Sequence, residues 1–308
     1  MPRGRGTLTI ELSSVPNSID AVITRLGEHR YIGDRPLATA IFLALRLGKP
    51  LFIEGEAGVG KTEAAKVMAD VLGARLIRLQ CYEGIDVAHA VYEWNYPRQL
   101  LHIRLLHEGE DRHQAEKEIF SREFLLRRPL LDAIDNQDEV PPVLLIDEID
   151  RSDEEFEAFL LELLSDFQIS IPELGTVRAK QPPFVVITSN RTREVHDALK
   201  RRCLYHWIDY PTLEKEVAIV RARAPEASEQ LAREVAALVQ GLRELDLYKV
   251  PGVAETLDWA RSLAALGATR IDPALVDATL GAALKYQEDL ERARQAVPEL
   301  VERARAGS

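Results

Sequence analysis

Cysteines, long apolar runs and basic tracts are all scarce in this chain, and each scarcity excludes a class of protein. Only two cysteines occur among 308 residues, Cys81 and Cys203, so we exclude a disulfide framework and expect buried, reduced thiols. No apolar run approaches the roughly 18 residues of a membrane helix. The opening Met-Pro-Arg-Gly-Arg-Gly-Thr has no apolar stretch behind its charges, so no secretory signal is predicted. We therefore expect a cytoplasmic protein without a membrane span.

Basic residues are also in the minority. The chain carries 39 lysines and arginines against 50 aspartates and glutamates, which gives a formal net charge of −11. Proteins that bind nucleic acid regardless of sequence usually present a basic stripe. The basic pairs Arg127-Arg128 and Arg201-Arg202 are brief and are not interleaved with aromatic residues. The composition therefore disfavours nucleic acid as a partner.

What the chain does contain is an unbroken phosphate-binding motif, Gly-Glu-Ala-Gly-Val-Gly-Lys-Thr, at residues 55–62. An apolar run precedes the motif and a helical pattern follows it, which is the order that such a loop requires. Backbone N–H groups of the loop surround phosphates, Lys61 reaches the β- and γ-phosphates, and Thr62 can ligate magnesium. The residues predicted to bind the nucleotide here are Gly55, Glu56, Ala57, Gly58, Val59, Gly60, Lys61, Thr62 and Glu63.

Two carboxylates follow a second apolar run, in the sequence Val-Leu-Leu-Ile-Asp-Glu at residues 143–148. A magnesium ion on bound ATP needs a hard oxygen ligand opposite Thr62, and Asp147 suits that role. Glu148 is placed one residue further on, where it would polarise an attacking water. We expect Asp150 and Asp153 to be solvated or capping residues.

A third β-like run, residues 184–189, is apolar at its start and is followed by Asn190 at a polar tip. In a parallel sheet its tip would lie between the two phosphate motifs, so Asn190 is predicted to orient the water and to touch the γ-phosphate. Soon afterwards Arg201 and Arg202 stand at a predicted helix end. Either arginine would stabilise transition-state charge on a neighbouring subunit's γ-phosphate. The alternative for both is a favourable cation at a helix C-terminus, and the sequence does not choose between them.

Five short β-like runs alternate with helical stretches, which predicts a parallel sheet with helices on both faces. The runs are 51–54, 76–80, 143–147, 184–189 and 204–208. Ser152, with Glu155 three residues later, predicts a capping box at the start of one helix. Beyond Pro211 only helical patterns occur, and we expect the charged stretch after Pro298 to fray. The predicted divisions are an N-terminal arm (1–18), an αβα domain (19–210) and an all-helical domain (211–308).

This order of motifs resembles that of the AAA+ ATPases, over about residues 19–290. The resemblance implies a P-loop αβα sandwich with a parallel sheet, followed by an all-helical lid. An insert running from Glu83 to Arg98 and a predicted hairpin at 169–177 are similar to features of the MoxR family. The strings at 79–84, 92–99 and 189–194 resemble its CoxD-type branch more narrowly.

The resemblance also implies roles for individual residues and for partners. It implies that Lys61 and Thr62 bind phosphate and magnesium, and that Asp147 binds magnesium. It implies that Glu148 is the general base, Asn190 the first sensor and Arg202 the arginine finger supplied in trans. Tyr31 and Ile32 would lie near the adenine. The cofactors would be ATP and Mg²⁺. The partners would be further copies in a ring, expected to be a hexamer, and a von Willebrand factor A domain protein. The client would be a metalloenzyme, a molybdenum-copper carbon monoxide dehydrogenase whose active site is assembled or activated.

One departure from the family concerns the second sensor arginine, which often lies near the start of the third lid helix. Residues 252–257 contain no arginine here, and Arg261 is the nearest candidate. Two other functions remain open for the same fold: a nucleic-acid-dependent motor and a nucleotide-gated scaffold. The aromatic residues Tyr92, Trp94 and Tyr96 in the insert would either grip a client or pack onto their own domain.

Overall fold

The computed structural model describes residues 15–105 and 118–306. This part of the chain divides into two compact units, which we describe separately. The sheet unit comprises residues up to 22, 36–54 and 65–206, and the lid unit comprises residues 23–35, 55–64 and 207 onward. Most of the predicted N-terminal arm lies outside the described residues.

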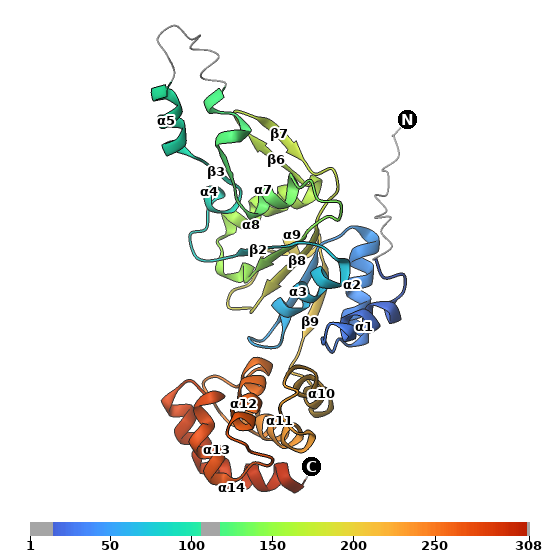
Figure 1. The fold of residues 1–308 in the computed structure, drawn as a ribbon, viewed down its shortest axis with the longest axis vertical. Helices are drawn as coiled ribbons and strands as arrows, with labels where there is room; N and C mark the ends of the chain where they lie inside the picture. Colours follow the sequence, from blue (N-terminus) through green and yellow to red (C-terminus); the bar gives the residue numbers. More distant parts are fainter. Residues whose placement is uncertain (1–14, 106–117, 307–308) are drawn as a thin grey trace. The chain divides into compact units, whose positions relative to one another are not determined.

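A five-stranded sheet has the strand order β2-β5-β8-β1-β9 (Figure 1). The pairings β2–β5, β5–β8 and β8–β1 are all parallel. The strands are β1 (Leu51–Gly55), β2 (Leu76–Gln80), β5 (Val143–Asp147), β8 (Phe184–Ser189) and β9 (Leu204–Ile208). The five predicted β-like runs are therefore confirmed. All residues of β1, β5 and β8 are buried, as expected for strands covered on both faces.

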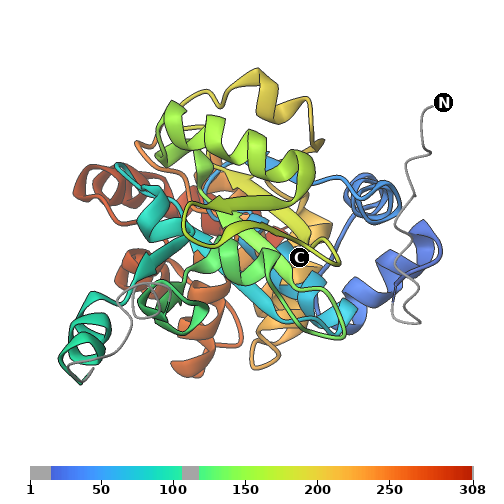
Figure 2. The same cartoon turned by 90° about the horizontal axis from the view of Figure 1, so that it is seen from above.

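Helices lie on both faces of this sheet (Figure 2). They include α2 (Arg35–Leu47), α3 (Lys61–Leu72), α7 (Pro129–Ile134), α8 (Glu154–Asp166) and α9 (Asp197–Lys200). Apolar residues of α7 and α8, such as Leu130 and Leu160, are fully buried in the core that the strands form. The expected α/β architecture, a parallel sheet between helices, is thus present.

The predicted capping box of Ser152 and Glu155 is wrong, because α8 begins one residue later than expected. The N-cap is Asp153, whose carboxylate accepts the N–H of Phe156 at 2.9 Å. Ser152 instead donates its hydroxyl to the carbonyl of Ile149, because the residues before it form the 3-10 helix η2 (Ile149–Arg151).

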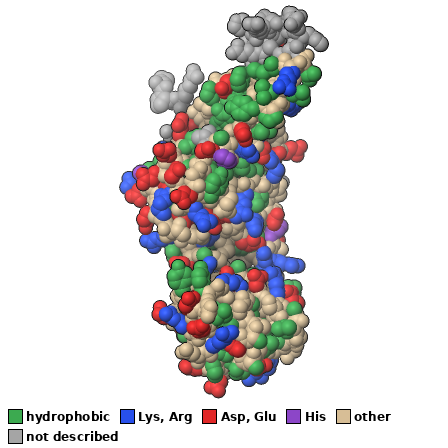
Figure 3. Space-filling model, turned by 90° about the vertical axis from the view of Figure 1, so that its left-hand side faces the viewer, with side chains coloured by type: hydrophobic (Ala, Val, Ile, Leu, Met, Phe, Trp, Pro, Cys, Tyr) green, Lys and Arg blue, Asp and Glu red, His purple; other side chains and the backbone are tan. Residues whose placement is uncertain are grey.

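The insert after β2 contains α4 (Val87–Ala90), β3 (Tyr92–Trp94) and α5 (Tyr96–Leu105), followed by η1 (Arg122–Phe124) and β4 (Leu125–Arg127). Strands β3 and β4 are antiparallel. Trp94 is buried and its ring lies edge-on to that of Phe120, with centroids 5.3 Å apart, so this aromatic residue packs on its own unit. Tyr96, by contrast, is 59% exposed and lies on α5 with the exposed Leu100, Leu101 and Leu105. Figure 3 shows one face of the molecule, on which several hydrophobic side chains are exposed.

The predicted hairpin forms from β6 (Gln168–Ile171) and β7 (Gly175–Arg178), which pair antiparallel. Gly175 ends its turn with φ +80°, a conformation that L side chains rarely adopt.

The lid unit contains α1 (Ile19–Glu28) in large part, and the helices of the C-terminal region. These are α10 (Leu213–Arg223), α11 (Glu229–Arg243), α12 (Val253–Ala265), α13 (Pro273–Thr279), η3 (Leu280–Ala282) and α14 (Gln287–Ala306). Asp272 caps α13, because its carboxylate accepts the N–H of Leu275 at 2.9 Å. The predicted fraying after Pro298 is wrong: α14 continues to Ala306, because Leu300, Val301 and Ala304 are buried in the lid core. In the described ranges no helix is both long and apolar enough to cross a membrane.

Candidate functional site

The phosphate-binding motif forms the loop between β1 and α3, whose first residue is Lys61. Gly55 and Gly58 occupy backbone conformations that demand glycine, with φ +157° and +77°. A Cβ at Gly55 would also meet the carbonyl oxygen of Ile208 at 2.2 Å. The glycines of the motif are therefore required by the path of the loop.

Lys61 folds back over this loop. Its side chain is buried, and Nζ donates to the carbonyl oxygens of Gly55 at 2.8 Å and Glu56 at 2.6 Å. The ammonium group is thus held at the loop by backbone oxygens, at the start of a helix whose N-terminal N–H groups attract anions.

The residues proposed near the adenine lie in the same unit. Tyr31 and Ile32 follow α1. Burial raises the pKa of Tyr31 above its ordinary value, and the negative charges of Asp34 and Glu63 add to that effect. Since Glu63 lies in the first turn of α3, Tyr31 shares its electrostatic environment with the phosphate-binding loop.

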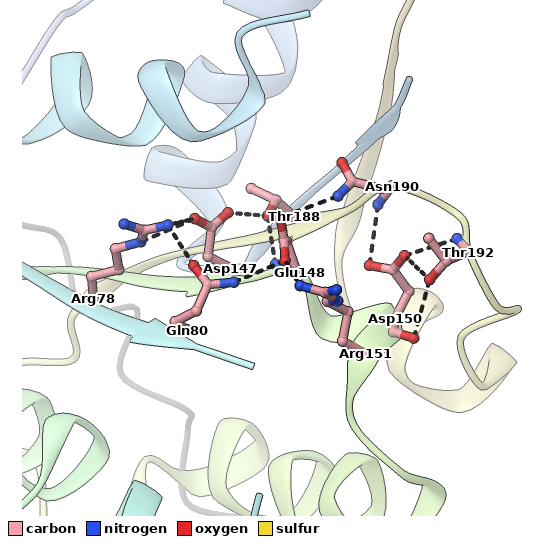
Figure 4. Close-up of polar contacts among 9 residues, drawn as sticks. All are labelled: Arg78, Gln80, Asp147, Glu148, Asp150, Arg151, Thr188, Asn190 and Thr192. Carbon is pink, nitrogen blue, oxygen red and sulfur yellow. Dashed lines mark hydrogen bonds and ion pairs between the residues drawn. The ribbon is translucent and has the colours of Figure 1, made fainter. Parts of the chain in front are cut away.

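In the sheet unit, Asp147 ends β5 and is 2% exposed. Its Oδ2 accepts hydrogen bonds from Arg78 Nε at 3.0 Å and Nη2 at 2.6 Å (Figure 4). Its Oδ1 accepts from the Thr188 hydroxyl at 2.5 Å. Arg78 comes from β2 and Thr188 from β8, so both neighbouring strands fix the orientation of this carboxylate.

Glu148 follows directly, in the left-handed region with φ 56° and ψ 52°. Its N–H donates to the Thr188 hydroxyl at 3.0 Å. Its carboxylate accepts from Asn190 Nδ2 at 3.3 Å and from Gln80 Nε2 at 3.0 Å, and pairs with Arg151 at 3.1 Å. The structure therefore brings the predicted base and the predicted sensor into contact, although it does not test their roles.

Asp150 differs from expectation, because it is neither solvated nor a helix cap. It is 3% exposed, and its carboxylate accepts the N–H groups of Asn190 at 3.1 Å and Thr192 at 2.8 Å, together with the Thr192 hydroxyl at 2.7 Å (Figure 4). Its negative charge is stabilised by N–H and O–H groups of the loop after β8. Asp150 thereby fixes the backbone that carries Asn190.

The two arginines after α9 are both exposed. Arg202 donates to the carbonyl of Leu161 at 3.1 Å, and Arg201 lies 3.9 Å from Asp197. Exposure at the protein surface is what a finger in trans requires, and both arginines meet this requirement. Arg261, the nearest candidate for a second sensor, donates to the carbonyl of Arg223 and pairs with Glu226.

Sequence reasoning missed Arg78, Gln80 and Thr188, and it misjudged Asp150. A signal was available for the first two. In β2 they stand two residues apart on the more exposed side of a strand whose Ile77 and Leu79 are buried, so both project from the same face. Thr188 was hidden within an apolar run, and only the strand order places its hydroxyl beside Asp147.

The carboxylate of Asp147 suits magnesium better than a metal whose ligands all come from protein side chains. Mg²⁺ is usually held by one or two carboxylates together with substrate phosphates. In the sheet unit, Asp147 supplies a buried carboxylate of the kind that this ion prefers. Within the described ranges no group of three or more His, Cys, Asp or Glu side chains could hold a metal ion by itself.

Comparison with known proteins agrees with this set of motifs. Residues 50–203 match the family model of the AAA domain, dynein-related subfamily, and the chain belongs to this family. The match runs from the residue before β1 to the end of the arginine-bearing segment, and so includes all the predicted catalytic residues. None of the curated proteins compared with the chain matches it.

The solved structures that this chain resembles include RuvB and a putative ATPase. The Holliday junction branch migration motor RuvB of Thermotoga maritima is 18% identical, with 87% of this chain and 72% of that chain covered and a TM-score of 0.45. A mutant form of the same motor is 19% identical, with 86% and 70% covered and a TM-score of 0.46. A putative ATPase from Cytophaga hutchinsonii is 16% identical, with 94% of each chain covered and a TM-score of 0.47.

Proposed function

We propose that the chain is a magnesium-dependent ATPase whose phosphate-binding loop acts together with Asp147, Glu148 and Asn190. The observation that carries this proposal is the contact of Glu148 with Asn190, beside an Asp147 that two neighbouring strands orient. Sheet topology supports it further. Strands β1, β8 and β5 are adjacent and parallel, so the loops that follow them leave the same edge of the sheet.

Each side chain has a task that its chemistry suits. Lys61 binds phosphate oxygens, for which its present carbonyl partners are weaker competitors because they carry no net charge. Thr62 and Asp147 would hold the magnesium ion, which when bound neutralises charge that develops on the phosphates. Glu148 takes the proton of the attacking water, and Asn190 orients that water while holding the Glu148 carboxylate in place.

Replacing Glu148 by Gln tests the proposal, because it keeps the hydrogen-bonding shape and removes the base. The variant should bind ATP with nearly the affinity of the parent and hydrolyse it at least about a hundredfold more slowly. Glu155→Gln, at an exposed carboxylate on α8, is the matched control and should hydrolyse normally. Near-normal turnover by the Glu148 variant would exclude its role as the base.

The purpose of hydrolysis rests on the resemblance to the MoxR family and its CoxD-type branch. We propose that the chain assembles into a ring, a hexamer, with a von Willebrand factor A domain partner. Hydrolysis would then remodel a metalloenzyme client, to assemble or activate the active site of a molybdenum-copper carbon monoxide dehydrogenase. The two alternatives make different predictions for ATP turnover. Stimulation by duplex or single-stranded DNA would favour a nucleic-acid motor, stimulation by the partner protein would favour the chaperone, and no turnover despite ATP binding would favour a scaffold.

A further inference from the structure

The helix α12 of the lid unit begins without a capping side chain. Its N-cap is Gly252, and the first N–H groups of any helix need partners from outside it. Here the partner is the phosphate-binding loop. The carbonyl oxygen of Gly58 accepts the N–H of Val253 at 2.9 Å and lies 3.4 Å from the N–H of Ala254. The loop therefore serves as the cap of α12.

Gly252 permits this close approach. A Cβ at Gly252 would lie 2.9 Å from both the carbonyl oxygen of Ala57 and the Cα of Gly58. Both are backbone atoms, so they cannot move aside as a flexible side chain would. The φ angle of Gly252 is −85°, which any residue adopts without strain. The glycine is thus required by the contact with the loop and not by its own backbone conformation.

The lid holds Gly252 firmly in this position. The Glu255 carboxylate accepts the N–H of Gly252 at 3.0 Å, and the Thr256 hydroxyl oxygen lies 3.0 Å from the Gly252 carbonyl oxygen. Arg243 donates to the carbonyl of the preceding Pro251 at 2.8 Å. Arg243 and Thr256 are both bound to the fully buried carboxylate of Glu216. The loop is consequently seated on a part of the lid that a buried polar network fixes.

A second contact lies at the other end of the motif. Glu63, the residue after Thr62, forms an ion pair with Arg223 of α10 at 2.7 Å. The carbonyl of Arg223 in turn accepts from Arg261 of α12 at 2.8 Å. Two different lid helices therefore hold the two ends of the segment that runs from Gly58 to Glu63.

We propose that Gly252 and Val253 are positioning residues of the phosphate site, and that the lid senses the bound nucleotide through their backbone contact with Gly58. Residues 252–257 carry no arginine, so no cation from this stretch reaches the phosphates. Because Gly58 lies within the loop that surrounds the phosphates, a change in the loop on nucleotide binding displaces the cap of α12. This inference rests on the proposed function, since it concerns how that site is held.

Gly252→Ala is the first test, since it adds only the Cβ that meets the loop. We expect the dissociation constant for MgATP to rise about tenfold or more. The KM for ATP should rise with it, while kcat at saturating ATP stays within about threefold, because the variant does not touch the hydrolytic residues. Gly252→Ser carries the same Cβ but restores a good capping side chain, so it should weaken binding similarly even if α12 is stabilised.

Gly281→Ala is the matched control. A Cβ there meets nothing within 4 Å, and the residue is an exposed glycine of the same unit. It should leave the dissociation constant within about twofold of the parent, as expected for surface substitutions. Thermal unfolding of all three variants checks that the lid remains folded.

Val253→Pro removes the N–H that Gly58 accepts. Proline suits the first position of a helix, and the extended conformation of Gly252 suits the residue before a proline. The helix itself should therefore form, while the proline ring excludes the Gly58 carbonyl from its present place. We expect weaker MgATP binding, comparable to that of Gly252→Ala.

Amide hydrogen exchange on the full chain without nucleotide tests the contact between Gly58 and Val253 independently of the proposed ATPase function. Slow exchange at Val253 in the parent, and faster exchange in Gly252→Ala, would support the contact without any ATP. If the parent binds no ATP, the proposed function fails and the sensing role fails with it. If the parent binds ATP and folded Gly252→Ala and Gly252→Ser bind it equally well, the proposed function stands and this inference is overturned.

Discussion

Arg78 of β2 donates two hydrogen bonds to a single oxygen of Asp147, at 3.0 and 2.6 Å. Arg78 is about half exposed, whereas Asp147 is nearly fully buried. A buried carboxylate has lost its hydrogen bonds to water. Without donors from the protein, its burial would therefore cost free energy of folding. The arginine therefore contributes to the stability of the sheet edge as well as to the orientation of the proposed magnesium ligand.

Replacing Arg78 by Ala should lower the free energy of unfolding by about 1.5–3 kcal/mol, the range for hydrogen bonds to charged groups. Urea unfolding measures the change. Arg75→Ala is the matched control, since Arg75 stands three residues earlier but pairs with the more exposed Asp132 and Asp138. Its loss should cost less than about 1 kcal/mol. Equal effects of the two substitutions would contradict a special role for the Asp147 pair.

Replacing Asp150 by Ala should slow hydrolysis more than it weakens nucleotide binding. The carboxylate fixes the N–H groups of Asn190 and Thr192, so its removal releases the loop that carries Asn190. We expect kcat to fall about tenfold or more, since small misplacements of catalytic groups have large effects. ATP binding should change little, which equilibrium titration would establish.

Asp153→Asn is the control for this loop. Asp153 caps α8 through its side-chain oxygen, and asparagine is an equally good capping residue. Its kcat should match that of the parent. A normal kcat in folded Asp150→Ala would show that Asn190 needs no such support or has no role in hydrolysis.

Replacing Arg202 by Ala should abolish ATP turnover and spare nucleotide binding, because a finger supplied in trans contributes about 10³–10⁵ in rate. The Arg202 side chain is exposed and donates to a backbone carbonyl, so little stability should be lost. Mixing this variant with Lys61→Ala chains should restore some activity, since mixed interfaces place an intact loop beside an intact arginine.

The same experiment with Arg201→Ala decides which arginine acts. Arg201 is 82% exposed and lies at the limit of ion-pair distance from Asp197. If Arg202→Ala hydrolyses ATP normally and Arg201→Ala does not, the assignment moves to Arg201. Normal hydrolysis by both variants would exclude a finger from this segment.

Both cysteines should resist thiol reagents in the native protein. Burial raises the pKa of Cys81 to about 12, with the charges of Asp147 and Asp150 adding to the effect, and burial likewise raises the pKa of Cys203 to about 12. At about pH 8 the reactive thiolate is therefore scarce in the native state. A colorimetric thiol reagent should label neither cysteine until denaturant is added, and then both.

The same shifts predict how stability depends on alkaline pH. A thiol whose pKa is raised by folding holds its proton in the native state after the unfolded chain has lost it. The stability that the protonated thiol contributes is fully present below the pKa of the unfolded chain, about 8.5. It is lost as pH rises toward the folded-state pKa of about 12. Cys81→Ala and Cys203→Ala should each reduce this alkaline loss, as measured by urea unfolding from about pH 7 to about pH 10. A parent whose stability is flat over this range would contradict the shifts.

Much of the fold follows from local sequence, because its signals are local. Strands β1, β5 and β8 are buried on both faces and so appear as continuous apolar runs. Local cues misled where tertiary contacts compete with them. Pro298 and the charges after it suggested fraying, yet burial of Leu300 and Val301 keeps α14 helical.

By itself, the sequence determined the phosphate-binding motif and the chemistry-bearing ends of three strands, since these depend on residue type and spacing along the chain. Only the tertiary structure decided which side chains support them. Arg78 and Thr188 reach Asp147 because the strand order places β2 and β8 on either side of β5. Likewise, Gly58 contacts Val253, far away along the chain, through backbone atoms that carry no sequence signal. Such contacts arise from packing, and so they become visible only once the chain is folded.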